Sequence, residues 1–179
     1  MSASITPSQT VGPFFGVGLP FEKGEQIAPA GSAGSIRIEG QVLDGHGDPV
    51  PDALLEVWQP DARGQYPIAA NGEPIGFGRC RTDAEGAFNF VTIKPGPSRA
   101  PDGRLQAPHL NITVFARGLL RHLVTRMYFP DEAAANIADP VLNLVEPDRR
   151  PTLLARADGG VLRFDIHLQG EGETVFFVI

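Results

Sequence analysis

The side chains in this sequence best suited to binding a transition metal are four histidines, one cysteine and two tyrosines. His46 stands in a turn between glycines, where we expect it to be solvated, and His122 and His167 are expected on exposed strand faces. His109 differs because it opens a predicted strand, on which residues two apart share one face. A His-x-His pair there would chelate one metal, but the second position is Asn111, whose amide oxygen is a weak ligand for iron or zinc. From these residues alone we expect no metal at this pair.

The tyrosines add one conditional candidate. Tyr128 falls late in a predicted strand, and Tyr66 lies in a Gly-Gln-Tyr loop. A lone tyrosine usually belongs to a core or its rim, so Tyr66 becomes a candidate only if other ligands converge on it. The motifs GxSxG, CxxC and HExxH and a glycine-rich loop followed by Lys-Ser/Thr are absent, which excludes the enzyme classes that use them.

Arg117 is a candidate for anion recognition. It lies in Phe-Ala-Arg-Gly at a predicted strand end, where an arginine is usually solvated or held in a surface ion pair. The functional alternative is recognition of a carboxylate or of a developing negative charge. If residues 109–117 are extended, Arg117 lies about 25 Å from His109. One small site within this chain would therefore not contain both.

The composition predicts a globular chain with its own core. Hydrophobic residues make up 42% and charged residues 20% of the 179 residues. A chain of this length can form one domain without disulfides or structural metals. A net charge of −6 disfavours nucleic-acid binding. The single cysteine, Cys80, forms no intrachain disulfide, and we find neither a signal-peptide pattern nor a membrane-spanning run. A cytoplasmic location is expected.

The chain pattern predicts an all-β fold. Glycine (21) and proline (17) are frequent, and short alternating stretches are separated by turn clusters such as residues 44–49 and 82–86. One helix is predicted, over residues 131–136, where the acidic start suits a helix N-terminus. We predict an antiparallel β-sandwich, or a partly open barrel, with little helix. The expected strands cover residues 36–42, 53–59, 87–92, 109–117, 122–129, 162–168 and 174–178.

Two regions are expected. Residues 1–35 are expected to form an irregular N-terminal arm, because clusters of proline and glycine interrupt any regular spacing of apolar residues. The arm carries Phe14, Phe15 and Phe21, so it is expected to pack on a partner or on the chain's own core. Residues 36–179 form the β-sandwich domain.

Six short blocks occur in order along nearly the whole chain. Together they resemble the intradiol ring-cleavage dioxygenases, and in particular the alpha type of chain in that family. The blocks are TPSQTVGPF (6–14), LEVWQ (55–59), TIKPGP (92–97), APHLN (107–111), RMYF (126–129) and QGEGETVFF (169–177).

The resemblance implies a β-sandwich that assembles as alpha–beta pairs in a larger oligomer. In such pairs the homologous beta chain holds non-haem ferric iron with two tyrosinates and two histidines. At the matching positions this chain keeps Tyr66 and His109 but has Ser98 and Asn111 instead of the other two ligands. Ferric iron is a hard cation that anionic phenolates stabilise, so two missing ligands leave too few strong ones. The resemblance therefore implies that this chain binds no metal and that the iron belongs to the partner.

The resemblance also implies where this chain contributes to the partner's site. Thr10, Gly12 and Pro13 in the arm would line the substrate pocket together with Arg117. Glycine allows close backbone approach to a flat substrate, and Arg117 would take a catalytic part by placing positive charge near an anion. The complex would cleave 3,4-dihydroxybenzoate (protocatechuate) with O₂ between its hydroxylated carbons to 3-carboxy-cis,cis-muconate.

Two other hypotheses remain at this point. The stretches 42–66 and 81–96 also resemble transthyretin-like β modules, which suggests a non-enzymatic binding module; the arm and tail blocks speak against it. A self-sufficient iron enzyme with altered ligands would be coloured and active alone, which Ser98 and Asn111 disfavour. A neighbouring gene for a beta-type chain with Pro-Gly-Pro-Tyr and His-x-His would favour the first hypothesis.

Overall fold

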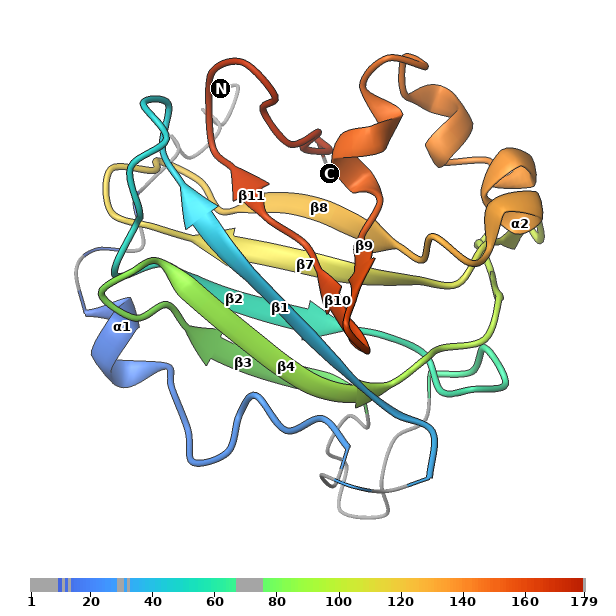
Figure 1. The fold of residues 1–179 in the computed structure, drawn as a ribbon, viewed down its shortest axis with the longest axis horizontal. Helices are drawn as coiled ribbons and strands as arrows, with labels where there is room; N and C mark the ends of the chain where they lie inside the picture. The colour runs from blue at the N-terminus through green and yellow to red at the C-terminus, as the bar shows by residue number, and fades with distance from the viewer. Residues whose placement is uncertain are drawn as a thin grey trace, which may run out of the picture.

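The fold is built from two packed sheets. A computed structural model describes residues 10, 12, 14–28, 31, 33–66 and 76–178. Strands dominate these residues and helical segments are short, as predicted (Figure 1). The elements are α1 (Phe15–Gly18), β1 (Ser35–Leu43), β2 (Leu54–Trp58), β3 (Phe77–Arg81), β4 (Ala87–Ile93), β5 (Ser98–Arg99), β6 (Leu105–Gln106), β7 (His109–Phe115), β8 (Leu123–Tyr128), α2 (Ala133–Ala138), η1 (Leu142–Leu144), η2 (Arg150–Leu153), β9 (Arg156–Asp158), β10 (Val161–Arg163) and β11 (Ile166–His167).

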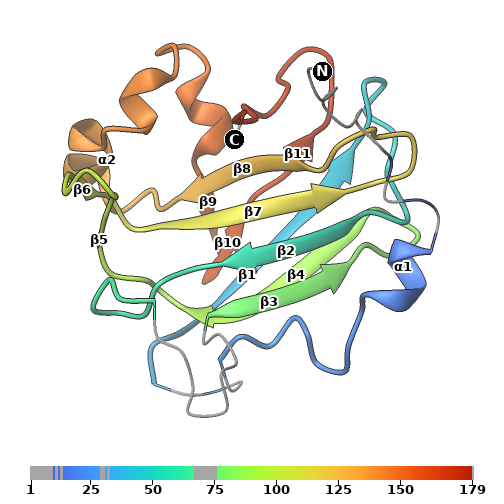
Figure 2. The same cartoon turned by 180° about the vertical axis from the view of Figure 1, so that it is seen from behind.

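One sheet has the strand order β3-β2-β7-β8 and is antiparallel throughout. The other is centred on β1, which pairs antiparallel with β4 and, along its other edge, with β10 and β11. These last two pairings are parallel, which the expectation of antiparallel strands did not include. Figure 2 shows the β3-β2-β7-β8 sheet in front, with β1 and β4 behind it.

The main core lies between the two sheets and follows the period-2 alternation of the sequence. In β4, Phe88, Phe90 and Thr92 are buried while their neighbours are half-buried. Apolar side chains of β1, β2, β7 and β8 belong to the same buried cluster as these phenylalanines. The predicted β-sandwich is confirmed.

A close backbone approach shapes the β1 edge. Between its pairings with β10 and β11, β1 passes the backbone of Phe164, whose N–H donates to the Glu39 carbonyl at 2.9 Å. A Cβ atom on Gly40 would lie 1.8 Å from the Phe164 carbonyl oxygen. Glycine is therefore required there, and the stretch predicted as one strand over 162–168 splits into β10 and β11.

A second, smaller core covers one end of the outer face of β7 and β8. Leu142, Val145 and Leu153, from the segment that follows α2, pack there against Tyr128 and Ala107. This layer covers Tyr128, which is fully buried on the outer face of the sheet.

The predicted helix over 131–136 begins two residues later, as α2. Asp131 and Glu132 are engaged elsewhere, because their carboxylates lie 2.7 and 2.6 Å from Nζ of Lys94. The prediction of a strand over 174–178 was wrong. The backbone N–H groups of this segment donate to three different elements: Thr174 to the His167 carbonyl, Val175 to the Thr152 hydroxyl and Phe177 to the Val124 carbonyl.

The described part of the arm packs on the chain's own sandwich. Phe15 and Ala28 are buried, Phe21 stacks against Phe77 with ring centroids 6.4 Å apart, and the Ile27 N–H donates to the Val91 carbonyl. Phe14 remains 79% exposed. Within the described residues, no helix is long and apolar enough to span a membrane.

Candidate functional site

Strand register brings the family's metal-ligand positions to one face of the β3-β2-β7-β8 sheet. Trp58, Asn111 and Arg126 are opposite one another in β2, β7 and β8, so they form a row across the sheet. His109 and Tyr128 form the next row on the same face. The predicted sharing of a face by His109 and Asn111 follows from this register.

Tyr66 is held over this face by a tight loop. Asp61 Oδ1 accepts hydrogen bonds from the Arg63 and Gln65 amides, both at 2.9 Å. The Tyr66 ring then stacks on Trp58 with centroids 5.5 Å apart. The Asn111 amide donates weakly to the Tyr66 hydroxyl, at 3.4 Å. The structure thus brings Tyr66 to Asn111.

Ser98 lies where the same loop meets the Pro-Gly-Pro segment. It is buried at the start of β5, and the α-carbon of Gly64 packs directly against the Pro97 carbonyl. Gly64 has φ +77°, a conformation that favours glycine. The loop that carries Tyr66 is therefore packed against the Pro-Gly-Pro segment that precedes Ser98.

His109 is neutral and has one ring nitrogen without a partner. Its Nδ1 lies 2.7 Å from the Ala107 carbonyl, which can only accept, so Nδ1 carries the proton. Nε2 is buried and makes no hydrogen bond with any described residue. Burial, and after it the positive charge of Arg126, lower the pKa of His109 to about 4. The ring therefore offers a free lone pair near neutral pH.

A buried carboxylate, that of Asp139, lies next to Tyr128. Asp139 is fully buried, and its oxygens accept hydrogen bonds from the Tyr128 hydroxyl at 3.1 Å and the Ala107 amide at 2.8 Å. The amides of Val141 and Leu142 donate to it at 2.8 and 2.7 Å. Burial raises the pKa of Tyr128, which keeps this phenol protonated as a donor. Asp139 thus joins β8, the β6–β7 connection and η1.

These residues do not fit a ferric ion. Of the four ligand positions, only Tyr66 and His109 carry strong donors, and Asn111 turns its amide hydrogens toward Trp58 and Tyr66. In the part of the chain that the structure describes, no three His, Cys, Asp or Glu side chains gather in a group able to hold a metal. The residues described at these positions therefore do not fit the iron that the family resemblance implies.

Arg117 lies beyond the opposite end of β7 from His109. It sits in a turn with Gly118 and forms an ion pair with Asp52, while its side chain stays 67% exposed. The connection from β7 to β8 and α1 lie at the same end of the sandwich, and α2 lies at the other (Figures 1 and 2). The structure keeps Arg117 and His109 apart, as the sequence predicted.

The arm residues assigned to the partner's pocket are described in part. Thr10 is exposed, and its hydroxyl accepts a hydrogen bond from the Gly12 amide at 3.3 Å. Gly12 has φ +74°, and a Cβ there would meet no atom within 4 Å. Pro13 lies outside the described residues.

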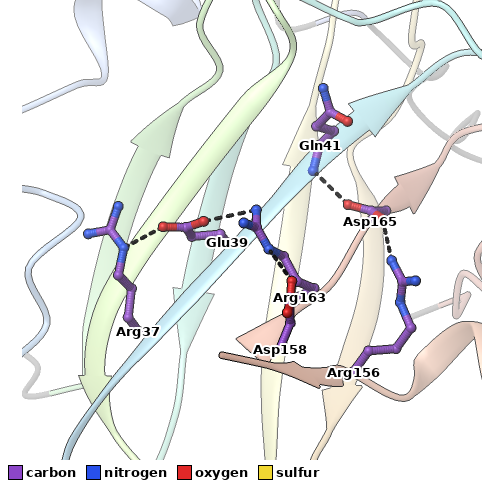
Figure 3. Close-up of polar contacts among 7 residues, drawn as sticks. All are labelled: Arg37, Glu39, Gln41, Arg156, Asp158, Arg163 and Asp165. Atoms are coloured by element: carbon purple, nitrogen blue, oxygen red, sulfur yellow. Dashed lines mark hydrogen bonds and ion pairs between the residues drawn. The ribbon is translucent and has the colours of Figure 1, made fainter. Parts of the chain in front are cut away.

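A second polar cluster lies on the outer face of the β1 sheet. Glu39 pairs with Arg37 and with Arg163, the latter at 2.9 Å (Figure 3). Asp158 lies 3.7 Å from Arg163, and Asp165 pairs with Arg156 at 3.1 Å. The arginines and acids of this cluster balance one another, so it presents no unmatched charge to a ligand.

Arg126 and Asp139 place charge beside the ligand positions, and neither is a candidate from its residue type and spacing alone. Alternation along the predicted strand over 122–129 does place Arg126 and Tyr128 on one face. Their position opposite Asn111 and His109 depends on the strand register, which is visible only in the structure.

Comparison with known proteins agrees with the fold and the motifs. A family model described as dioxygenase matches residues 10–170. The chain is 45% identical to the protocatechuate 3,4-dioxygenase alpha chain of Burkholderia cepacia over 96% of both chains. It is 47% identical to that of Pseudomonas putida, over 96% of this chain and 95% of that one.

A beta chain and a solved structure are also similar. The protocatechuate 3,4-dioxygenase beta chain of Burkholderia cepacia is 35% identical, over 78% of this chain and 66% of that one. The dioxygenase domain of a carbohydrate-binding fusion protein from Streptomyces sp. SirexAA-E superposes with a TM-score of 0.59 at 26% identity, covering 93% of this chain and 99% of that one. The chain therefore belongs to the intradiol ring-cleavage dioxygenase family that its motifs resemble.

Proposed function

We propose that this chain is the iron-free alpha subunit of a protocatechuate 3,4-dioxygenase, and that a homologous beta chain supplies the ferric iron. The complex would cleave 3,4-dihydroxybenzoate with O₂ between the two hydroxylated carbons and release 3-carboxy-cis,cis-muconate. Similarity to alpha chains over 96% of the chain supports this proposal over a non-enzymatic transthyretin-like module.

The observation that carries the proposal is the donor set at the family's metal position. Ser98 and Asn111 stand where two ligands would be needed, and Arg126 adds a positive charge opposite Asn111. A chain that keeps the whole family fold but not its metal ligands fits a subunit whose chemistry lies in its partner.

The contribution of this chain to the reaction would come from the end of the sandwich that bears Arg117. An exposed guanidinium with a single carboxylate partner can turn toward a second anion, such as the carboxylate of the substrate or product. Asp52, which is 19% exposed, would hold Arg117 in place. Thr10, Gly12 and Pro13 would add backbone and small side chains to the same pocket wall.

The test begins with the chain expressed alone and with a beta chain that carries Pro-Gly-Pro-Tyr and His-x-His. The chain alone is expected to be colourless, iron-free and inactive. The complex is expected to hold one iron for each pair of chains and to consume O₂ with 3,4-dihydroxybenzoate. One iron bound by the chain alone, with visible colour, would contradict the proposal.

The role of Arg117 is tested in the complex with Arg117→Gln. Loss of one charge interaction of about 1.4 kcal/mol is expected to raise KM for 3,4-dihydroxybenzoate about tenfold. The matched control is Arg104→Gln, because Arg104 is also an exposed arginine (63%) paired with one aspartate, Asp102, in the β5–β6 turn. Equal KM values for the two variants would remove Arg117 from the pocket.

A further inference from the structure

Arg126 is a half-buried cation beside the family's metal position. It lies directly opposite Asn111 in the antiparallel pair of β7 and β8, where facing Cβ atoms are about 5 Å apart. Among the described residues its guanidinium donates only to the Tyr128 hydroxyl, at 3.4 Å, and no carboxylate lies within ion-pair distance. No described residue thus neutralises its charge by a direct contact.

The neighbours of Arg126 still include one good metal ligand. His109 lies one row away on the same face, with its ring 5.7 Å from that of Tyr128. Its Nε2 is buried, unprotonated and without a hydrogen-bond partner among the described residues, and Nδ1 is fixed by the Ala107 carbonyl. A backbone acceptor on Nδ1 is the arrangement that orients ligand histidines in metal sites. The site therefore keeps one oriented metal ligand, one row of the sheet away from the positive charge of Arg126.

We propose that the guanidinium of Arg126 is a second, electrostatic barrier that excludes metal cations from this site. The inference rests on the proposed function of an iron-free alpha chain. An arginine stays protonated at every working pH, so a fixed positive charge faces any cation that approaches His109 and Tyr66. In a partly buried site such repulsion is weakly screened by salt. Restoring the two missing ligand types would then not be enough to restore metal binding.

A purely structural role for Arg126 makes a different prediction. Through the Tyr128 hydroxyl, Arg126 is linked to the buried carboxylate of Asp139. If balancing that carboxylate were its only effect, replacing Arg126 would lower stability but would leave metal uptake unchanged. Metal content is therefore the measurement that separates the two roles.

The experiment uses the full chain with iron supplied during expression. It compares Ser98→Tyr/Asn111→His with the same pair carrying Arg126→Gln, which removes the charge, or Arg126→Lys, which keeps it. The Gln triple variant is expected to retain at least tenfold more iron per chain than the other two and to absorb visible light. The inference is overturned if the double variant takes up as much iron, if Gln and Lys act alike, or if no variant takes up iron.

A second pair of variants covers a failure to fold, because Ser98 is buried and a tyrosine there must displace its neighbours. Asn111→His is compared with Asn111→His/Arg126→Gln by titration with Co²⁺, after circular dichroism confirms the fold. At least tenfold tighter Co²⁺ binding is expected without the arginine, and equal binding overturns the inference. Iron in the unmodified chain would contradict the proposed function itself, which keeps the two failures distinct.

Discussion

Replacing Asp139 by alanine is expected to destabilise the chain by about 4 kcal/mol, because the buried carboxylate satisfies four donors at once. The amides of Ala107, Val141 and Leu142 and the Tyr128 hydroxyl all donate to it. Without it these donors stay buried and unpaired, at a cost of about 1 kcal/mol each at the low end of the usual range. That loss is a large part of the roughly 5–15 kcal/mol that stabilises a typical domain.

The measurement is urea denaturation of the full chain followed by circular dichroism. Tyr128→Phe removes one of the four donors and leaves the carboxylate in place, so it is expected to cost only about 1 kcal/mol. Asp158→Ala is the control, since that carboxylate is 70% exposed and lies 3.7 Å from Arg163; a change below about 0.5 kcal/mol is expected. A loss below about 1 kcal/mol for Asp139→Ala would refute the reasoning, because the four donors would then have other acceptors.

Three further predictions follow from contacts described above. His109 is buried with a pKa of about 4, so between pH 6.5 and 4 its imidazole binds a proton in the unfolded chain but not in the folded one. The free energy of unfolding should therefore fall by about 3 kcal/mol as the pH drops through this window. His109→Gln should remove that part of the pH dependence, as measured by urea titrations at several pH values. Gly40→Ala should cost about 3 kcal/mol because its Cβ would collide with the Phe164 carbonyl, whereas Gly18→Ala, with no atom within 4 Å, should change the unfolding free energy by less than about 0.5 kcal/mol. Tyr66→Phe should leave the iron content and O₂ consumption of the alpha–beta complex unchanged, and a loss of iron from the complex would make Tyr66 a ligand after all.

The strands whose partners lie close in sequence or whose faces alternate strictly were predictable. In β4, Phe88 and Phe90 alternate with half-buried neighbours, and β7 and β8 share a short connection. The tail over 174–178 shows a similar apolar pattern yet forms no strand, because its backbone partners come from three separate elements. Periodicity reports which face a residue takes but not whether a continuous partner strand is present.

The candidate site was predictable by position but not by interaction. Motif order placed Tyr66, Ser98, His109 and Asn111, and the structure brings Tyr66 to Asn111 on a shared sheet face. The neighbours of these positions come from register and from the second core. Arg126 faces Asn111 only because β8 pairs with β7 in one particular alignment, and Tyr128 is buried by the layer after α2.

The length of β7 has a consequence for how this chain tolerates change. Its seven residues separate His109 from the turn that carries Arg117 by roughly 20 Å, and β2 and β8 hold the strand rigid on both sides. Substitutions that far apart, with no shared partner, contribute additively to the free energy. A double-mutant cycle between the two positions should therefore show no coupling. A chain built this way can accumulate substitutions at one end of the strand while selection preserves the other end unaltered.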